Sequence, residues 1–146
     1  MKLNQYTDYS LRVLIYLAVK EKETDSLSTI RQISEIYNVS KNHLVKVVHR
    51  LSTLSYLTTT TGKTGGIRLA KKPSEINIGQ IIREMESSMD IVECFNRTDQ
   101  PCIITGNCFL TGVLKNALKA FMDELSKYTL EDLIKNQGIL TSKFKK

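Results

Sequence analysis

The chain has 146 residues, of which 41% are hydrophobic, enough for one core and too few for several large domains. Its start does not resemble a signal peptide, and the apolar run over residues 11–19 is short and interrupted by Arg12, so we expect a cytoplasmic protein with no membrane contact. The net charge of +6 comes entirely from residues 1–75, which carry 12 Lys or Arg against 6 Asp or Glu, whereas residues 76–146 carry 9 of each.

Two helices are predicted at the start of the chain. Apolar residues recur at helical spacing from Thr7 or Asp8 to about Lys20. Thr7 is the expected N-cap, and Asp8 would lie in the first turn, where negative charge suits the helix dipole. We expect Ser28 to cap a second helix and Asn38 to adopt the left-handed conformation of a tight turn after it.

A third helix is predicted to begin after Ser40, its expected N-cap. Its apolar stripe consists of Leu44, Val47, Val48, Leu51 and Leu54, and its opposite face carries Asn42, Lys46, His49 and Thr53. A face with amide, ammonium and imidazole groups and no carboxylate suits a DNA groove, with residues 40–43 closest to the DNA. Two helices joined by a short turn also occur in proteins that never bind DNA, so this motif alone leaves the question open.

A basic hairpin is predicted directly after the third helix. Residues 56–61 and 67–70 are β-prone, and the turn between them is rich in glycine. A hairpin in this position is typical of the wing of a winged helix-turn-helix. The turn superficially resembles a nucleotide-binding loop, but Leu57 stands where the first glycine is required and no helix follows the turn.

The charge pattern favours a nucleic-acid partner for this region. Between Glu35 and Glu75 there is no acidic residue, which is typical of a polyanion-binding surface, although a solvated surface can also lack acids by chance. We expect Asn42 and Lys46 to read base edges, and Lys41, Lys63 and Arg68 to contact phosphates. The full expected DNA-binding set is Ser28, Ser40, Lys41, Asn42, His43, Lys46, His49, Lys63, Thr64, Gly65, Gly66 and Arg68.

The second half is predicted to be helical on both sides of a loop. Asn77 is the expected cap of a short helix to about residue 86, and residues 110–127 form a long helix with a wide apolar face. That face is interpreted as a dimer interface, the alternative being that it packs back onto the first helix. Thr129 and Asp132 are expected to cap a last short helix, and residues 141–146 to be loose. The fold class is therefore mainly α with a small β-hairpin, divided into a winged helix-turn-helix domain (1–75), a short helix and cysteine loop (76–109), and a dimerisation helix and tail (110–146).

Three cysteines, Cys94, Cys102 and Cys108, lie within one short stretch and are the only ones in the chain. In a reducing compartment they favour metal binding or sensing over disulfides. Their wide spacing differs from the close pairs of zinc sites and from the Cys-x-x-Cys of oxidoreductases, and no catalytic base accompanies them, so we do not expect an enzyme. An iron–sulfur cluster, zinc and free redox thiols all remain open on spacing alone.

Four segments carry a resemblance to a known family: residues 4–12 (NQYTDYSLR), 42–51 (NHLVKVVHRL), 65–69 (GGIRL) and 92–95 (VECF). Together they resemble the nitric-oxide-sensing repressors of the Rrf2 family of winged-helix regulators. The resemblance implies a homodimer that binds a palindromic operator in double-stranded DNA and releases it when nitric oxide nitrosylates an iron–sulfur cluster.

The resemblance also implies the ligands of that cluster. These would be Cys94, Cys102 and Cys108, with Asp8, expected from the other subunit, as a fourth ligand. A 4Fe–4S cluster is favoured over a 2Fe–2S cluster. Without the resemblance, Asp8 would be interpreted only as a helix-dipole partner. The alternative function is a related winged-helix regulator that senses iron or redox status through a 2Fe–2S cluster or free thiols.

Overall fold

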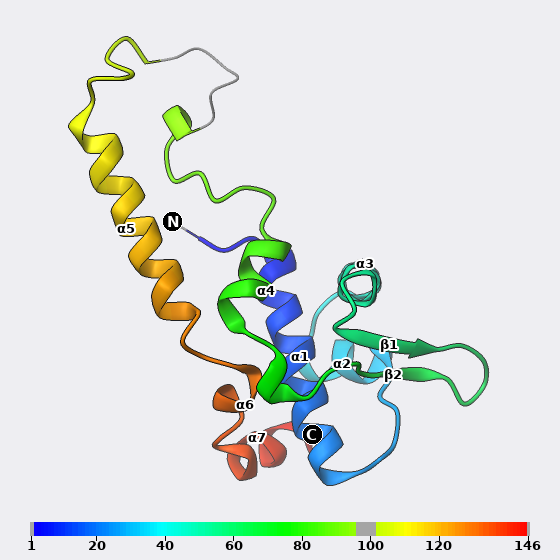
Figure 1. Ribbon diagram of the computed structural model, residues 1–146. Coiled ribbons are helices and arrows are strands. Elements are labelled where there is room, and N and C mark those ends of the chain that lie inside the picture. Colours follow the sequence, from blue (N-terminus) through cyan, green and yellow to red (C-terminus); the bar gives the residue numbers. More distant parts are fainter. Residues whose placement is uncertain (1, 96–101, 146) are drawn as a thin grey trace.

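In the computed structural model, which describes residues 2–95 and 102–145, the chain is mainly helical with one two-stranded antiparallel sheet (Figure 1). The elements follow in this order: α1 (Gln5–Glu23), α2 (Ile30–Tyr37), α3 (Lys41–Thr53), β1 (Leu57–Thr60), β2 (Gly66–Leu69), η1 (Pro73–Glu75), α4 (Ile78–Met85), η2 (Glu93–Phe95), α5 (Phe109–Leu125), α6 (Leu130–Leu133) and α7 (Gln137–Phe144). The predicted fold class is confirmed. Within the described ranges no helix is long and apolar enough to cross a membrane.

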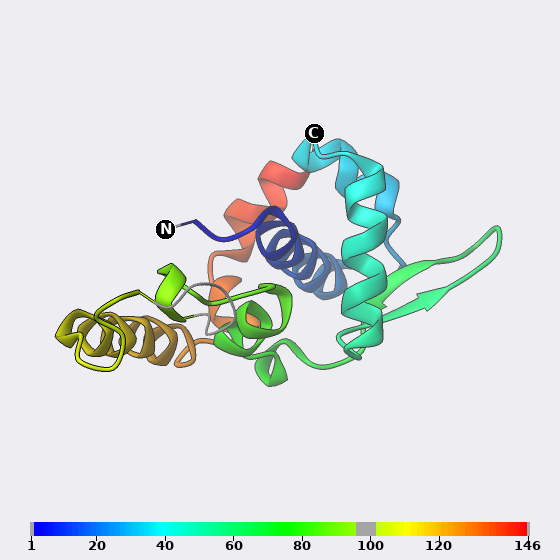
Figure 2. The same cartoon turned by 90° about the horizontal axis from the view of Figure 1, so that it is seen from above.

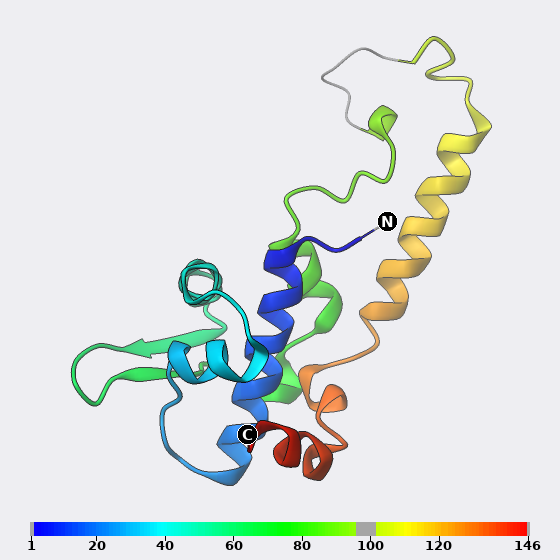
Figure 3. The same cartoon turned by 180° about the vertical axis from the view of Figure 1, so that it is seen from behind.

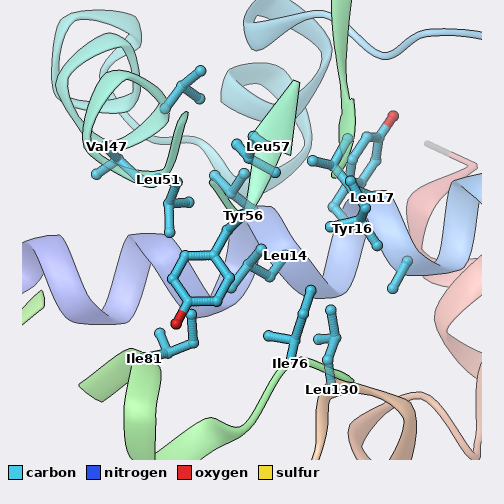
Figure 4. Packing of buried hydrophobic residues seen from close by; sticks show 14 of the residues in the cluster. Leu14, Tyr16, Leu17, Val47, Leu51, Tyr56, Leu57, Ile76, Ile81 and Leu130 are labelled. Atoms are coloured by element: carbon cyan, nitrogen blue, oxygen red, sulfur yellow. The ribbon is translucent and has the colours of Figure 1, made fainter. Parts of the chain in front are cut away.

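Helix α1 is the centre of the core. Leu14 and Leu17 are fully buried, with Leu51 on one side of α1 and Ile76 and Ile81 on the other (Figure 4). The ring of Tyr56 crosses between the two sides, and its hydroxyl donates a 2.6 Å hydrogen bond to Glu84 of α4. Helices α3 and α4 thus both pack on α1. Burying this apolar surface is the main favourable contribution to folding.

The start of α1 differs from the prediction. Asn4 is the N-cap, and its side-chain oxygen accepts a 2.8 Å hydrogen bond from the backbone N–H of Thr7, which is itself buried. Asn4 is held there by Glu86, whose carboxylate accepts hydrogen bonds from both its backbone N–H and its side-chain amide. The prediction of Thr7 as the cap is wrong because this tertiary contact fixes where the helix begins.

The helix-turn-helix unit comprises α2, α3 and the turn between them. Thr29 caps α2 in a reciprocal capping box with Gln32, so the prediction of Ser28 as the cap is wrong. Asn38 is left-handed at φ 51°, ψ 49°, as predicted. Ser40 precedes α3 as predicted, although its hydroxyl makes no capping hydrogen bond with the described residues.

The hairpin forms with β1 and β2 in antiparallel register, from Leu57 opposite Leu69 to Thr60 opposite Gly66. The tip projects away from the body on the side of α1 opposite to α5 (Figures 1 and 3). Ser28 forms a bridge with Ile67, its N–H donating to the Ile67 carbonyl at 3.1 Å. The base of the wing is thereby attached to the segment that precedes α2.

Helix α5 stands away from the rest of the molecule. Its C-terminal half packs against the core through Met122, which is buried, and through the half-buried Leu118, Phe121 and Leu125. Its N-terminal half extends beyond the body, clear of α1 (Figures 1 and 2). The alternative prediction that α5 packs back along α1 is therefore wrong, and much of its apolar face is left exposed.

The C-terminal segment is helical in two places, α6 and α7. Thr129 and Asp132 form the predicted capping box of α6. The prediction of a loose tail is wrong, because residues 137–144 form α7 and Phe144 is buried between the rings of Tyr16 and Tyr37, at centroid distances of 5.2 and 5.7 Å.

Candidate DNA-binding surface and cysteine site

Helix α3 presents the predicted polar face to solvent. Leu44, Val47, Val48 and Leu51 are buried against α1, and the side chains between them point outward. The predicted DNA-binding residues Ser40, Lys41, Asn42, His43, Lys46 and His49 are all exposed. The helix thus offers hydrogen-bond donors and positive charge on one unobstructed face, which is what major-groove recognition requires.

The tip of the wing is exposed, with Lys63 and Thr64 at its end. Its glycines have steric roles inside the hairpin. A Cβ on Gly65 would lie 2.2 Å from the Thr60 carbonyl oxygen, and one on Gly66 would lie 2.7 Å from the Ser28 carbonyl oxygen. These two glycines close the turn and allow the base of the wing to approach the preceding loop, and Lys63 remains the cation at the tip.

Two other predicted DNA-binding residues are partly engaged by the protein itself. Ser28 is 6% exposed, at the base of the wing. Arg68 donates a 2.5 Å hydrogen bond from Nη2 to the carboxylate of Asp25, whose own side chain is 97% exposed. The ion pair thereby positions Arg68 on the outer surface of β2. Because the Asp25 carboxylate is exposed, Arg68 could exchange it for a phosphate.

The sequence interpretation missed two residues near this surface. Val45 is 45% exposed on the outward side of α3, three residues after Asn42 and four before His49. The helical spacing of exposed positions could have revealed it. Tyr9 of α1 stacks on His43 at the start of α3, with ring centroids 6.3 Å apart and an interplanar angle of 26°. That contact joins residues far apart in sequence and had no local signal.

The cysteine site lies at the free end of α5. Cys94, in η2, and Cys108, just before α5, are both half-buried. The sulfur of Cys94 lies 3.9 Å from the Thr111 hydroxyl oxygen. Hydrogen bonds from the Thr111 hydroxyl, and then from backbone N–H groups in the first turn of α5, hold the pKa of the Cys108 thiol below its ordinary value.

Cys102 is placed differently. Its side chain is exposed, and its carbonyl accepts a 2.8 Å hydrogen bond from the N–H of Thr105 in a turn. Part of the predicted cysteine loop, residues 96–101, lies outside the described residues. The structure thus places two of the three predicted cysteine ligands half-buried at the start of α5 and in η2, and leaves the third facing solvent.

Asp8 lies on α1, at a hollow of about 620 Å³ lined also by Gln5, Tyr9, Arg12 and Tyr37. Its carboxylate forms an ion pair with the guanidinium of Arg12, one helical turn later, at a distance of 2.8 Å. The guanidinium of Arg12 in turn lies 5.9 Å from the ring centroid of Tyr9 and 5.7 Å from that of Tyr37. Asp8 is therefore accessible from outside the chain and connected to α2 through Arg12.

The donor chemistry fits an iron–sulfur cluster. Thiolates are the ligands that such clusters prefer, and the Thr111 contacts favour the thiolate form of Cys108. Over residues 2–95 and 102–145, no three His, Cys, Asp or Glu side chains lie close enough together to hold one metal ion. The donors present in one protomer are thus of the right type, and a complete ligand set requires that they be brought closer.

Comparison with known proteins gives consistent matches along the chain. Residues 3–136 match Rrf2, a family described as iron-dependent transcriptional regulators. The HTH-type transcriptional regulator NsrR of Bacillus subtilis is 51% identical over 94% of this chain and 92% of its own length, and that of Shouchella clausii is 48% identical over 96% and 93%. Among solved structures, CymR, the global cysteine regulator of B. subtilis, matches with a TM-score of 0.64 and 27% identity, covering 91% of this chain and 95% of that one.

Proposed function

Because this chain belongs to the Rrf2 family and is a DNA-binding transcriptional regulator, we propose that it is a cytoplasmic repressor whose hold on its operator depends on an iron–sulfur cluster that nitric oxide attacks. The family resemblance inferred from the sequence is thereby confirmed. Its relatives are named as regulators, a role that involves no catalysis. The ligands of the cluster would be Cys94, Cys102, Cys108 and Asp8.

The observation that carries the proposal is the placement of two half-buried thiols, Cys94 in η2 and Cys108 just before α5, with the Cys94 sulfur 3.9 Å from the Thr111 hydroxyl oxygen of α5. The contact places η2, which precedes the cysteine loop, next to the first turn of α5, which follows it, so Cys94 and Cys108 mark the two ends of the loop. Cys102 lies between them in the sequence. When bound, a 4Fe–4S cluster supplies exposed iron that reacts with nitric oxide, and an oxygen ligand at one iron leaves that iron easier to attack than thiolate would.

Asp8 connects the proposed sensor to DNA reading. In this structure its carboxylate is paired with Arg12, at 2.8 Å. An Asp8 that binds iron must give up part of this pairing, which frees Arg12 to change its contact with Tyr37 of α2. Next to Asp8 in sequence, Tyr9 stacks on His43 of α3. The contacts of Arg12 with Tyr37 and of Tyr9 with His43 therefore join the start of α1 to α2 and α3, the two helices of the DNA-reading unit. A coupling free energy of a few kcal/mol between the cluster site and these helices is enough for a switch.

A homodimer accounts for the free face of α5. Phe109 is 86% exposed, and Leu110 and Val113 are also well exposed along the N-terminal half of the helix. A second copy packed on this face would bury these side chains and relate two α3 helices by a two-fold axis, as a palindromic operator requires. It would also allow Asp8 of one subunit to serve the cysteine site of the other.

The test uses anaerobically purified protein and a palindromic DNA site that this protein selects from a random pool. Iron and sulfide content, absorbance and a Mössbauer spectrum establish the cluster, and operator affinity is measured before and after a stoichiometric dose of nitric oxide. We expect a loss of affinity of at least tenfold, about 1.4 kcal/mol, because a smaller coupling would not act as a switch. Unchanged affinity in cluster-loaded protein would rule out nitric-oxide sensing.

Two variants serve as matched controls in that experiment. Asn42→Ala should weaken operator binding in both states while the nitric-oxide effect persists, and Cys108→Ser should abolish cluster binding and the effect together. The exposed Cys102 favours one alternative, a regulator that senses redox status through a 2Fe–2S cluster or free thiols. Protein that lacks sulfide and responds to oxidants but not to nitric oxide would support this alternative.

A further inference from the structure

We propose that Val45 is a specificity-determining residue of the DNA-binding surface: its isopropyl group packs on the C5-methyl group of a thymine in the major groove. This inference rests on the DNA-binding function and is independent of the iron–sulfur cluster. It assigns a role to a side chain that has no hydrogen-bond donor or acceptor and therefore stands apart from the polar residues around it.

Val45 lies on the outward side of α3, near the start of the helix. It is 45% exposed and follows Lys41, the first residue of α3, by four positions. At 3.6 residues per turn it lies roughly 60° from Asn42 and roughly 40° from His49 around the helix axis. It thus shares a face with the side chains expected to meet DNA, in the N-terminal part of a recognition helix, which is the part that contacts base edges.

The surroundings of Val45 suit a polyanion. Lys41 and Lys46 are exposed beside it, and the chain has no acidic residue between Glu35 and Glu75. Helix α3 lies at one edge of the molecule, beside the wing (Figure 2). This setting favours DNA over an apolar protein surface as the partner of Val45, because an apolar partner would remove the neighbouring ammonium groups from water without pairing them.

A valine can recognise only one group on the base edges. The major groove offers hydrogen-bond donors and acceptors at every base pair, and the thymine methyl is the apolar group among them. Packing Val45 on that methyl removes apolar surface of both partners from water, which is favourable. Packing it on a polar base edge would instead deprive a donor or acceptor of water without replacing the hydrogen bond, which costs free energy. Val45 therefore favours thymine and disfavours the other bases.

An isolated exposed apolar side chain is common on protein surfaces, so the test must separate DNA reading from mere exposure. It uses full-length protein, purified anaerobically, and the DNA site that this protein selects from a random pool. Each thymine of the site is replaced in turn by deoxyuridine, which lacks only the C5-methyl group. The ratio of the two affinities measures the sensitivity of the protein to that methyl group.

Three variants are compared with the parent protein. Val45→Ser removes both γ-methyl groups, and Val45→Ile retains an apolar branched side chain. Valine, serine and isoleucine have similar helix propensities, so α3 itself should persist, as circular dichroism can verify. Ile139→Ser is the control, because Ile139 is likewise branched and exposed but lies on α7.

For the parent protein we expect about fourfold weaker binding when the methyl group of one particular thymine in each half-site is absent. That thymine should lie within about two base pairs of the position at which Asn42→Ala relaxes base preference, because the two side chains are less than one helical turn apart. Val45→Ser should lose the sensitivity to this methyl group. Val45→Ile and Ile139→Ser should keep it.

A Val45→Ser protein that is as sensitive as the parent, or a parent protein indifferent to every thymine methyl, would overturn the role of Val45 and leave DNA binding and the cluster proposal intact. A sensitive thymine remote from the position read by Asn42 would likewise overturn it. Parent protein that selects no DNA site would instead overturn the DNA-binding surface itself, and the role of Val45 with it.

Discussion

The guanidinium of Arg12 lies 2.8 Å from the carboxylate of Asp8, one helical turn earlier, and at the same time over the rings of Tyr9 and Tyr37. The ion pair is half-exposed, and pairs of this kind contribute little by themselves. The contacts with two rings place Arg12 between α1 and α2, at the junction of the proposed ligand and the DNA-reading unit.

Arg12→Ala should therefore destabilise the cluster-free protein by about 1 kcal/mol, chiefly through the lost cation–ring contacts. Urea unfolding monitored by circular dichroism measures this change. The matched control is Arg31→Ala, which removes an exposed pair with Glu35 of the same helical spacing and should cost less. Equal losses in the two variants would mean that the rings contribute nothing.

Asn42 and Lys63 should affect DNA binding in different ways. Asn42→Ala should reduce discrimination between operator and scrambled DNA by about 1–3 kcal/mol, because an exposed amide on α3 can read a base edge. Lys63→Ala should weaken binding to all sequences and flatten the salt dependence by about one unit for each protomer, because the wing tip meets phosphates.

Fluorescence anisotropy over a range of salt concentrations separates these effects. Lys119→Ala, on α5 and far from the wing, should leave both quantities unchanged (Figure 1). A Lys63→Ala protein with altered sequence preference and an unchanged salt slope would contradict the assignment.

Asp25 should lower the affinity of the protein for DNA. Its carboxylate lies 2.5 Å from Nη2 of Arg68, so Asp25→Asn removes an acidic group beside the wing, in the segment between α1 and α2, and releases Arg68 toward phosphate. We expect tighter non-specific binding and a salt slope steeper by about one unit for each protomer. Asp123→Asn, which likewise releases a lysine but on α5, is the control and should change neither. Weaker binding by Asp25→Asn would show that the pair orients Arg68 for DNA.

Phe144 should anchor the C-terminal helix. Phe144→Ala empties a buried position between Tyr16 and Tyr37 and should lower the free energy of unfolding by about 3 kcal/mol. Ile139→Ala, on the exposed side of α7, should cost less than about 0.5 kcal/mol. Chemical denaturation of the two variants decides the matter, and a loss below about 1 kcal/mol for Phe144→Ala would indicate that α7 is not docked in solution.

Most local patterns predict the structure correctly, the exception being the capping box of Thr29 with Gln32, where the sequence pointed to Ser28. The stripe of Leu44, Val47, Val48 and Leu51 determines which face of α3 is buried, because residues three and four apart share one side of a helix. The left-handed turn at Asn38 and the capping box of Thr129 with Asp132 depend on neighbours within a few residues. The wing followed from β-prone segments around a glycine-rich turn.

Features that join distant segments were decided only by the tertiary structure. Asn4, not Thr7, caps α1 because Glu86 holds it from the end of α4. Phe144 is buried because two tyrosines of α1 and α2 form its pocket, although the tail has no periodic pattern of its own. The sequence by itself determined three thiols and their spacing. Only the packing of η2 against α5 brings Cys94 to Thr111, near the start of the helix that Cys108 precedes, because contacts across a loop depend on where its ends are held in space.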